Sequence, residues 1–169
     1  MSVFSKIKEA QVSKSGQYFK EGNYKVRIKA VKLINSQAGP AKQFFVIECE
    51  VMQSDNSDIQ VGSEKSHVID MSKVMALPNI KGFMAAISGV DPTCETVNDD
   101  VEAFWKQELL KKELIEENEH VPFDDLCDLV VDEKINLLKD IEMKLECVTI
   151  QTREKGQDFT KHNWQIRQV

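Results

Sequence analysis

The chain has 169 residues, of which 41% are hydrophobic and 30% are charged, and its formal net charge at pH 7 is −6. This composition is typical of one soluble globular domain, and it excludes a chain dominated by disorder. No stretch approaches the ~20 apolar residues of a membrane span. Residues 1–10 contain charged side chains where a signal peptide would have an apolar run. We therefore expect a cytoplasmic protein that does not enter a membrane.

The negative charge is concentrated in one segment. Residues 91–140 contain five Lys and sixteen Asp or Glu, a net charge of −11. Residues 1–90 carry a net charge of +4, and residues 141–169 carry +1. The acidic average of the chain therefore does not exclude a polyanionic partner, because the rest of the chain is mildly basic.

A long first strand is predicted after an N-terminal arm at residues 1–21. Tyr24, Val26 and Ile28 alternate with basic residues, which gives the strand one apolar face and one basic face. The alternation changes phase at Val31. This change predicts a β-bulge or strong coil, so that a single strand can serve two parts of a sheet.

Two further strands and a helix are predicted next. Residues 42–52 give the clearest strand of the chain, with an unbroken apolar face, and residues 63–70 predict a less apolar third strand. Pro78 then opens a short helix whose apolar residues have helical spacing, and Gly89 follows at its expected end. We expect this helix to pack on the core.

The acidic segment 91–140 is predicted to be a largely helical insertion within the domain. Polar residues at 98–100 supply a cap for a helix that runs toward Glu117. Trp105 lies on its apolar face and is the expected anchor of this helix. A second short helix is expected to end at Val131.

The period of two returns at Ile141 and predicts a terminal hairpin, with Trp164 and Ile166 on the inner face of its last strand. Five strands with a helix between the third and the fourth predict a mainly β fold with a helical insertion. We expect a single five-stranded barrel domain of the oligonucleotide-binding (OB) type. A doubly wound parallel sheet would need helices between the first three strands, and none is predicted there.

Several kinds of chemistry are excluded or disfavoured. The glycine-rich loops that hold phosphates in nucleotide enzymes are absent. A calcium loop starting at Asp55 would need glycine where Gln60 stands. Asp140, Glu142 and Lys144 are residue types that metal-dependent nucleases use, but alternate exposed positions of a strand explain them better. We therefore expect no enzyme activity, no cofactor and no metal.

A basic and aromatic surface remains. Binding of single-stranded nucleic acid without sequence preference needs cations that contact successive phosphates and aromatic rings on which bases stack. In an OB barrel the ligand lies on the second and third strands and on the hairpin between the fourth and fifth. The candidate residues are Lys25, Arg27, Lys29, Lys42, Phe44, Arg153, Lys155, Phe159 and Lys161.

Each candidate also has a purely structural interpretation. The three cations of the first strand could be no more than its solvated side. Phe44 could pack under the acidic insertion, and Phe159 could be a cross-strand partner that stabilises the hairpin. Tyr18 and Phe19 could form an arm around a bound strand or a staple that closes the bottom of the barrel. We favour the staple.

Five segments of the sequence form a recognisable set, namely residues 16–28, 44–51, 61–64, 79–83 and 152–164. Together they resemble the single-stranded DNA-binding proteins of tailed bacteriophages. The resemblance covers residues 16–89 and 141–169. It implies a non-enzymatic protein, in the cytoplasm of a bacterial host, that coats single-stranded DNA during phage replication or recombination.

The resemblance also raises a question about the acidic segment. Many single-stranded DNA-binding proteins end in an acidic tail that recruits partners, whereas this chain ends in a predicted strand. Residues 91–119 could do that work from within the fold, or they could cover an opening of the barrel. The alternative function is therefore an OB-like interaction module that recruits a replication or repair protein through its acidic helices.

Overall fold

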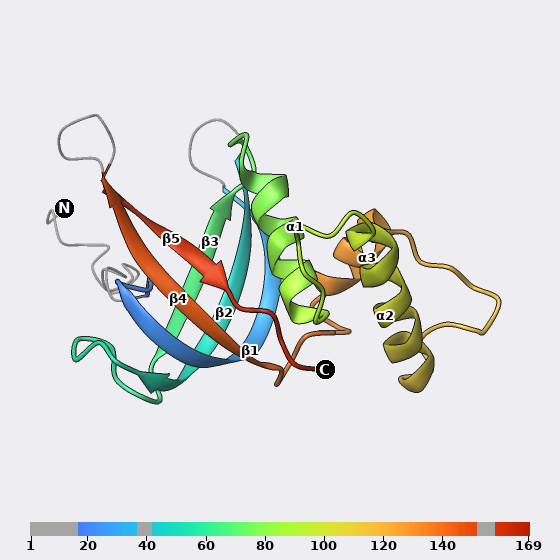
Figure 1. Cartoon of the computed structure of the whole chain (residues 1–169), viewed down its shortest axis with the longest axis horizontal. Helices are drawn as coiled ribbons and strands as arrows, with labels where there is room; N and C mark the ends of the chain where they lie inside the picture. Colours follow the sequence, from blue (N-terminus) through green and yellow to red (C-terminus); the bar gives the residue numbers. More distant parts are fainter. Residues whose placement is uncertain (1–16, 37–41, 152–157) are drawn as a thin grey trace, which may run out of the picture.

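A strongly curved sheet with a layer of helices beside it makes up the protein (Figure 1). The structure is a computed structural model that describes residues 17–36, 42–151 and 158–169. Its elements are β1 (Gly22–Asn35), β2 (Gln43–Ser54), β3 (Glu64–Asp70), α1 (Ala76–Ile87), α2 (Val97–Lys111), α3 (Phe123–Val130), β4 (Glu142–Gln151) and β5 (Asp158–Trp164).

The sheet is antiparallel, with the strand order β3-β2-β1-β4-β5. Strand β1 lies in the middle, where it pairs with β2 along its length and with β4 over residues 22–27. Its register with β2 shifts between Lys25 and Val26 and again between Ile28 and Ala30. Such irregularities bend and twist a strand. The prediction of a long, irregular first strand that serves two parts of the sheet is confirmed.

The sheet does not close into a barrel, so this part of the prediction was wrong. Strands β3 and β5 are its two edges, and within the described residues they share no backbone ladder. Side chains connect them instead. The rings of His67 and His162 stack with their centroids 3.7 Å apart, and Nε1 of Trp164 donates to Nδ1 of His67 over 3.1 Å. We call these three residues the β3–β5 seam.

The end of the N-terminal arm explains part of the missing backbone pairing between β3 and β5. Tyr18 forms a parallel bridge with Ser66 of β3, whose N–H donates to the carbonyl of Gln17 over 2.7 Å. That amide is therefore not available to β5. Phe19 is only 3% exposed, and its ring contacts the rings of Tyr24 and His162. Phe19 is therefore a core residue, but the sheet forms no closed barrel for it to staple, and the Tyr18 side chain is exposed.

Helix α1 closes the core on the inner side of the sheet. It begins at Ala76, two residues earlier than the predicted start at Pro78, and it ends before Gly89, as predicted. Gly89 has a φ of 73°, and a Cβ there would lie 2.9 Å from the carbonyl oxygen of Arg167. Glycine is favoured at such a helix end because a side chain would strain the backbone and meet the C-terminal segment.

The C-terminal strand contributes one core residue rather than two. Trp164 is partly buried, and its ring lies 5.0 Å from that of Phe83 in α1. Ile166 was predicted to be buried with it, but it is 48% exposed. The reason is that β5 ends at Trp164 and the chain then follows α1, where the N–H of Arg167 donates to the carbonyl of Ala86 over 2.9 Å.

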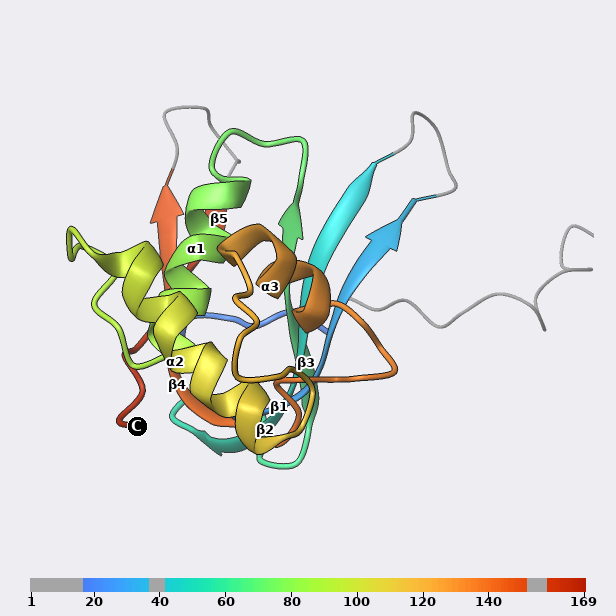
Figure 2. The same cartoon turned by 90° about the vertical axis from the view of Figure 1, so that its right-hand side faces the viewer.

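Helices α2 and α3 form a second layer outside α1 (Figure 2). Trp105 is 2% exposed, and its indole N–H donates to Oγ of Ser88 over 2.8 Å. Its predicted role as the anchor of the insertion is confirmed. Helix α2 ends at Lys111, earlier than predicted, and the chain turns at Glu113 with a φ of 58°. In the described part of the chain, no helix has the length and apolar character needed to cross a membrane.

Candidate nucleic-acid interface

The cations predicted on β1 each lie close to a carboxylate of a neighbouring strand. Nζ of Lys25 and Nη2 of Arg27 both lie 3.7 Å from the carboxylate of Glu142 in β4. Nζ of Lys29 lies 3.9 Å from Glu50 in β2. These side chains are partly exposed to solvent, so each pair stabilises the fold by only about 0–1 kcal/mol. The pairs nevertheless neutralise much of the charge that the sequence placed on this face.

The β2–β3 part of the outer face shows the same pairing. Nζ of Lys42 lies 3.9 Å from Asp70 in β3. Phe44 pairs in register with Asp70 and is half-buried. Nζ of Lys32, a residue that was not among the candidates, lies 2.9 Å from Glu48, and this hydrogen bond raises the pKa of Lys32. An anionic ligand on this face would have to compete with carboxylates that are already in place.

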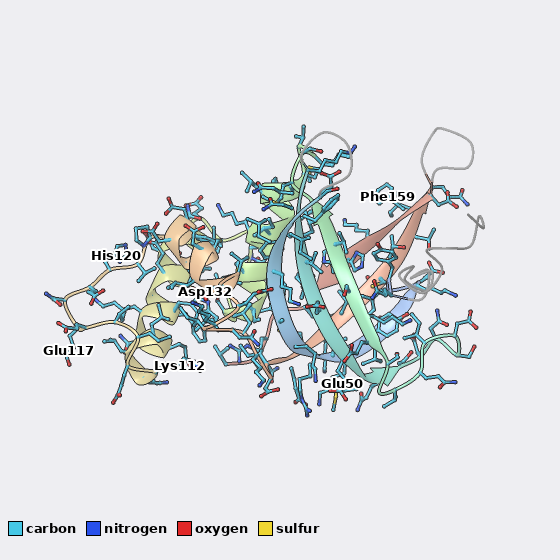
Figure 3. The ribbon with its side chains drawn as sticks, turned by 180° about the vertical axis from the view of Figure 1, so that it is seen from behind. Glu50, Lys112, Glu117, His120, Asp132 and Phe159 are labelled. Atoms are coloured by element: carbon cyan, nitrogen blue, oxygen red, sulfur yellow. The ribbon has the colours of Figure 1, made fainter. Side chains whose placement is uncertain are left out.

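The β4–β5 hairpin differs because it extends beyond the rest of the sheet (Figures 1 and 3). Pairing between β1 and β4 ends at Cys147, whereas β4 and β5 remain paired beyond it. Phe159 lies opposite Ile150 on the outer face of this two-stranded ribbon, and Lys161 lies opposite Val148. The Phe159 side chain is 53% exposed. It is therefore a cross-strand partner whose ring is still largely open to solvent.

Lys161 also differs from the cations of β1. Among the described residues it forms no salt bridge, and it is exposed. The other two hairpin candidates, Arg153 and Lys155, lie outside the described residues. The described hairpin thus combines an exposed aromatic ring with an unpaired cation on the same face.

The candidates fall into two groups rather than one. Lys42 and Phe44 lie on the β2–β3 side of the sheet, and Phe159 lies on the hairpin at its other edge. The outer face of β4 joins the hairpin to β1, because Lys25 pairs in register with Lys144. The acidic insertion extends away from the hairpin. Figure 3 shows Glu117 and His120 at the opposite end of the molecule from Phe159.

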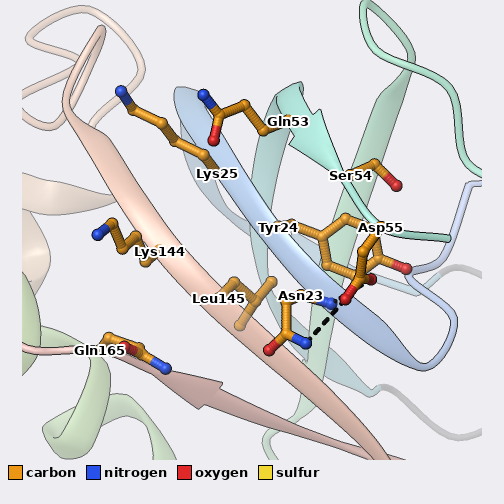
Figure 4. A pocket seen from close by; sticks show the side chains of 9 residues that line it. All are labelled: Asn23, Tyr24, Lys25, Gln53, Ser54, Asp55, Lys144, Leu145 and Gln165. Atoms are coloured by element: carbon orange, nitrogen blue, oxygen red, sulfur yellow. Dashed lines mark hydrogen bonds between the residues drawn. The ribbon is translucent and has the colours of Figure 1, made fainter.

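A hollow on the outer face of β1 and β4 was not predicted (Figure 4). Its volume is about 410 Å³, and Lys25, Lys144, Gln53 and Gln165 contribute to its lining. The hollow depends on the register of β1 against β4, which brings together residues more than a hundred positions apart in the chain. That register cannot be inferred from a single sequence, so the hollow had no sequence signal.

The histidines of the seam are neutral at pH 7. Burial, together with the neighbouring ring of His162, holds the pKa of His67 well below its usual range. Burial also lowers the pKa of His162 to about 4. The buried Nε2 of His162 has no hydrogen-bond partner among the described residues. The surroundings of this pair are structural in character: rings stack, and the indole of Trp164 donates one hydrogen bond.

The thiols and carboxylates do not form a metal site in the described part of the chain, where no group of three or more His, Cys, Asp or Glu is arranged to hold an ion. All four cysteines are free thiols. Burial raises the pKa of Cys127 to about 11 and that of Cys147 to about 12. Glu142 and Lys144, which resembled part of a nuclease cluster, both lie on the solvent side of β4.

Comparisons with known proteins leave the family open. No protein-family model matches the sequence, and no curated protein matches it. The resemblance to phage single-stranded DNA-binding proteins therefore remains a prediction from the segments named above.

Proposed function

We propose that the protein binds single-stranded DNA without sequence preference and protects it during phage replication or recombination. The topology supports this proposal. The order β3-β2-β1-β4-β5, with a helix after β3, is the order of an OB fold, which is a partly open five-stranded barrel. In this interpretation the β3–β5 seam is the opening of the barrel, and α2 and α3 are additions to it.

The single observation that carries the proposal is the outer face of the β4–β5 hairpin. Phe159 is half exposed, and Lys161 follows it on the same face without an ion-pair partner among the described residues. A base stacked on an aromatic side chain contributes ~1 to 3 kcal/mol. The hairpin between the last two strands is a ligand-binding element of OB folds. We therefore place the main contact with bases on Phe159.

The cations of β1 and β2 take a secondary role in this proposal. A phosphate that approaches Lys25 or Arg27 must share them with Glu142, and one that approaches Lys29 must displace Glu50. The net gain from each such contact is smaller than for a cation without a partner. Lys161 is therefore the first phosphate contact that we assign.

Fluorescence anisotropy with a mixed-sequence oligonucleotide tests the proposal. Log affinity should fall linearly with log salt concentration, and Phe159→Ala should weaken binding by ~1 to 3 kcal/mol. Phe159→Leu keeps an apolar partner for Ile150 but has no ring, so it should bind as weakly as the alanine variant, whereas Phe159→Trp should bind at least as well as the wild type. Absence of binding, or a leucine variant that binds like the wild type, would contradict the proposal.

One observation favours a second function, the recruitment of a replication or repair protein. The acidic helical layer lies at the other end of the molecule from the hairpin, so it is accessible when the hairpin is occupied (Figure 3). Replacing the exposed acids Glu113, Glu116, Glu117 and Glu119 with Gln leaves the Trp105 anchor in place. Loss of a host replication or repair protein from pull-downs with this variant, with unchanged DNA binding, would support recruitment.

A further inference from the structure

Three adjoining hollows form a groove on the outer face of β1 and β4. The first, of about 410 Å³, shares Lys25, Lys144 and Gln165 with a second hollow of about 370 Å³. The second shares Glu142 and Arg167 with a third, of about 610 Å³. We call this surface the β1–β4 groove. It is separate from the outer face of the hairpin that carries Phe159.

Two lysines stand side by side at the centre of the groove. Lys25 and Lys144 are direct cross-strand partners, and like charges in such positions destabilise a sheet. Gln53 pairs with Lys25 on the β2 side. On the β5 side, the N–H of Gln165 donates to the carbonyl of Lys144 over 3.0 Å. A row of ammonium and side-chain amide groups thus crosses the groove, as Figure 4 shows.

The acids near this row are already occupied. Glu142 is shared between the two β1 cations that flank it. Asp55 accepts hydrogen bonds from the backbone N–H of Asn23 over 2.7 Å and from its Nδ2 over 2.9 Å, which hold the pKa of Asp55 below its usual range. Glu146 accepts a hydrogen bond from a side-chain amide of β5. Lys144 has no salt bridge within the described part of the chain, so its charge is available to a ligand.

The groove offers charge but no ring on which a base could stack. Four cations line it, namely Lys144, Lys25, Arg27 and Arg167, together with three carboxylates, those of Asp55, Asp140 and Glu142. The one aromatic residue in its lining, Tyr24, is 4% exposed and donates its hydroxyl to the carbonyl of Lys20 over 2.7 Å. An elongated groove with a line of cations suits a chain of phosphates more than it suits bases or a neutral molecule.

We propose that the β1–β4 groove binds the sugar-phosphate backbone of a single strand, with one phosphate between Lys25 and Lys144. The choice of ligand rests on the proposed function. The inference adds a second contact to it, which recognises phosphates alone, while Phe159 recognises bases. The outer face of β4 connects the two contacts: Lys144 and Ile150 are six residues apart, roughly 20 Å at the rise of an antiparallel strand.

The experiment compares two single-stranded ligands, an ordinary oligonucleotide and an abasic oligomer that has the same phosphates but no bases. The variant is Lys25→Gln with Lys144→Gln in the full chain. Its matched control is Lys112→Gln with Lys134→Gln, which removes the same charge from exposed positions in the acidic insertion. Each phosphate contact to a single strand contributes about 0.7 to the slope of log affinity against log salt. Because the two lysines share one phosphate, the groove variant should lose about 0.7 from the slope with both ligands, and the control should lose little.

The outcomes separate the groove from the proposed function. Wild-type binding of the ordinary oligonucleotide, with a slope that the groove variant does not change, would overturn the groove and leave the function standing. Binding of the abasic oligomer through the two lysines, with no gain in affinity from bases, would support the groove and contradict stacking on Phe159. If the wild type binds neither ligand, both proposals are wrong. Unchanged circular dichroism of the variants shows that the fold is intact.

Discussion

The two faces of β5 carry similar side chains in opposite surroundings. On the outer face, Phe159 is largely exposed, and Lys161 has no ion-pair partner among the described residues. On the inner face, the rings of His162 and Trp164 each stack on the ring of His67 in the β3–β5 seam, and Trp164 also packs against Phe83. Residue type alone therefore does not distinguish a binding surface from a structural contact. Position along β5 does distinguish them, since one set of alternate residues is open to solvent and the other set is covered by β3 and α1.

Trp164→Ala should give the largest effect in this comparison, and it should act on stability. The substitution removes the contact with Phe83 and the hydrogen bond to His67. Loss of a large core aromatic typically lowers the free energy of unfolding by about 3 kcal/mol. Denaturant titration measures this change. Trp164→Phe, which keeps ring packing without the N–H donor, should lose less. An alanine variant as stable as the wild type would contradict the structural role assigned to the inner face of β5.

The second-largest effect should come from low pH, which should lower the free energy of unfolding through the histidines of the inner face. Above about pH 6.5 the seam histidines are neutral in both the folded and the unfolded chain, so stability there does not depend on them. Because the folded pKa of His162 is about 4, the unfolded chain binds a proton that the folded chain does not bind as the pH falls below about 6.5. The free energy of unfolding should therefore fall by up to about 3 kcal/mol by pH 4.

Denaturant titrations at a series of pH values measure this decline. His67 should add to it, because its pKa is also lowered in the folded protein. His162→Gln should make the decline shallower than in the wild type. Equal slopes in this variant and the wild type would show that the seam does not cause the decline.

Lys161→Gln should act on binding alone. The lost phosphate contact should reduce the salt slope by about 0.7, while the free energy of unfolding stays within about 0.5 kcal/mol of the wild type. Lys29→Gln serves as the comparison, because Glu50 already neutralises this lysine. Its effect on the slope should be smaller. Equal losses from both variants would show that ion pairing within the sheet does not decide which cations bind.

The smallest effect is expected from removing an acid. Glu142→Gln releases Lys25 and Arg27 from their shared carboxylate. Affinity for an oligonucleotide should rise, and the salt slope should steepen by up to about 0.7. Glu116→Gln removes the same charge from the exposed insertion and is the control. An equal gain from both variants would indicate that only the net charge of the protein matters.

Local features of the fold were predictable from the sequence, because they depend on residues close together in the chain. The phase change near Val31 predicted the irregular β1, and the apolar spacing around Trp105 predicted a docked helix. The features that were missed depend on long-range pairing. The apolar pattern of one strand specifies which of its faces is buried. The failure of β3 to join β5 and the pairing of Lys25 with Lys144 depend in addition on how the whole sheet curves and on how distant strands align.

The candidate site shows the same limit. Phe159 and Lys161 were identified from the alternation along the last strand, and their outward positions follow from it. The sequence contains the carboxylates that pair with Lys25, Lys29 and Lys42, but it does not show that they are partners, since each comes from a different strand. Counting the charges of one strand therefore overstated how basic its face is.

Because only side chains connect β3 and β5 within the described residues, the sheet can open locally along the β3–β5 seam. Separating β3 from β5 breaks the stack of His67 on His162 and the hydrogen bond from Trp164. Within the part of the chain that the structure describes, it breaks no backbone ladder between the two strands. Amide hydrogens along these two edges should therefore exchange with solvent through local motions. Those of residues 24–27 in β1, which pair with β2 on one side and β4 on the other, should exchange only when the sheet itself comes apart.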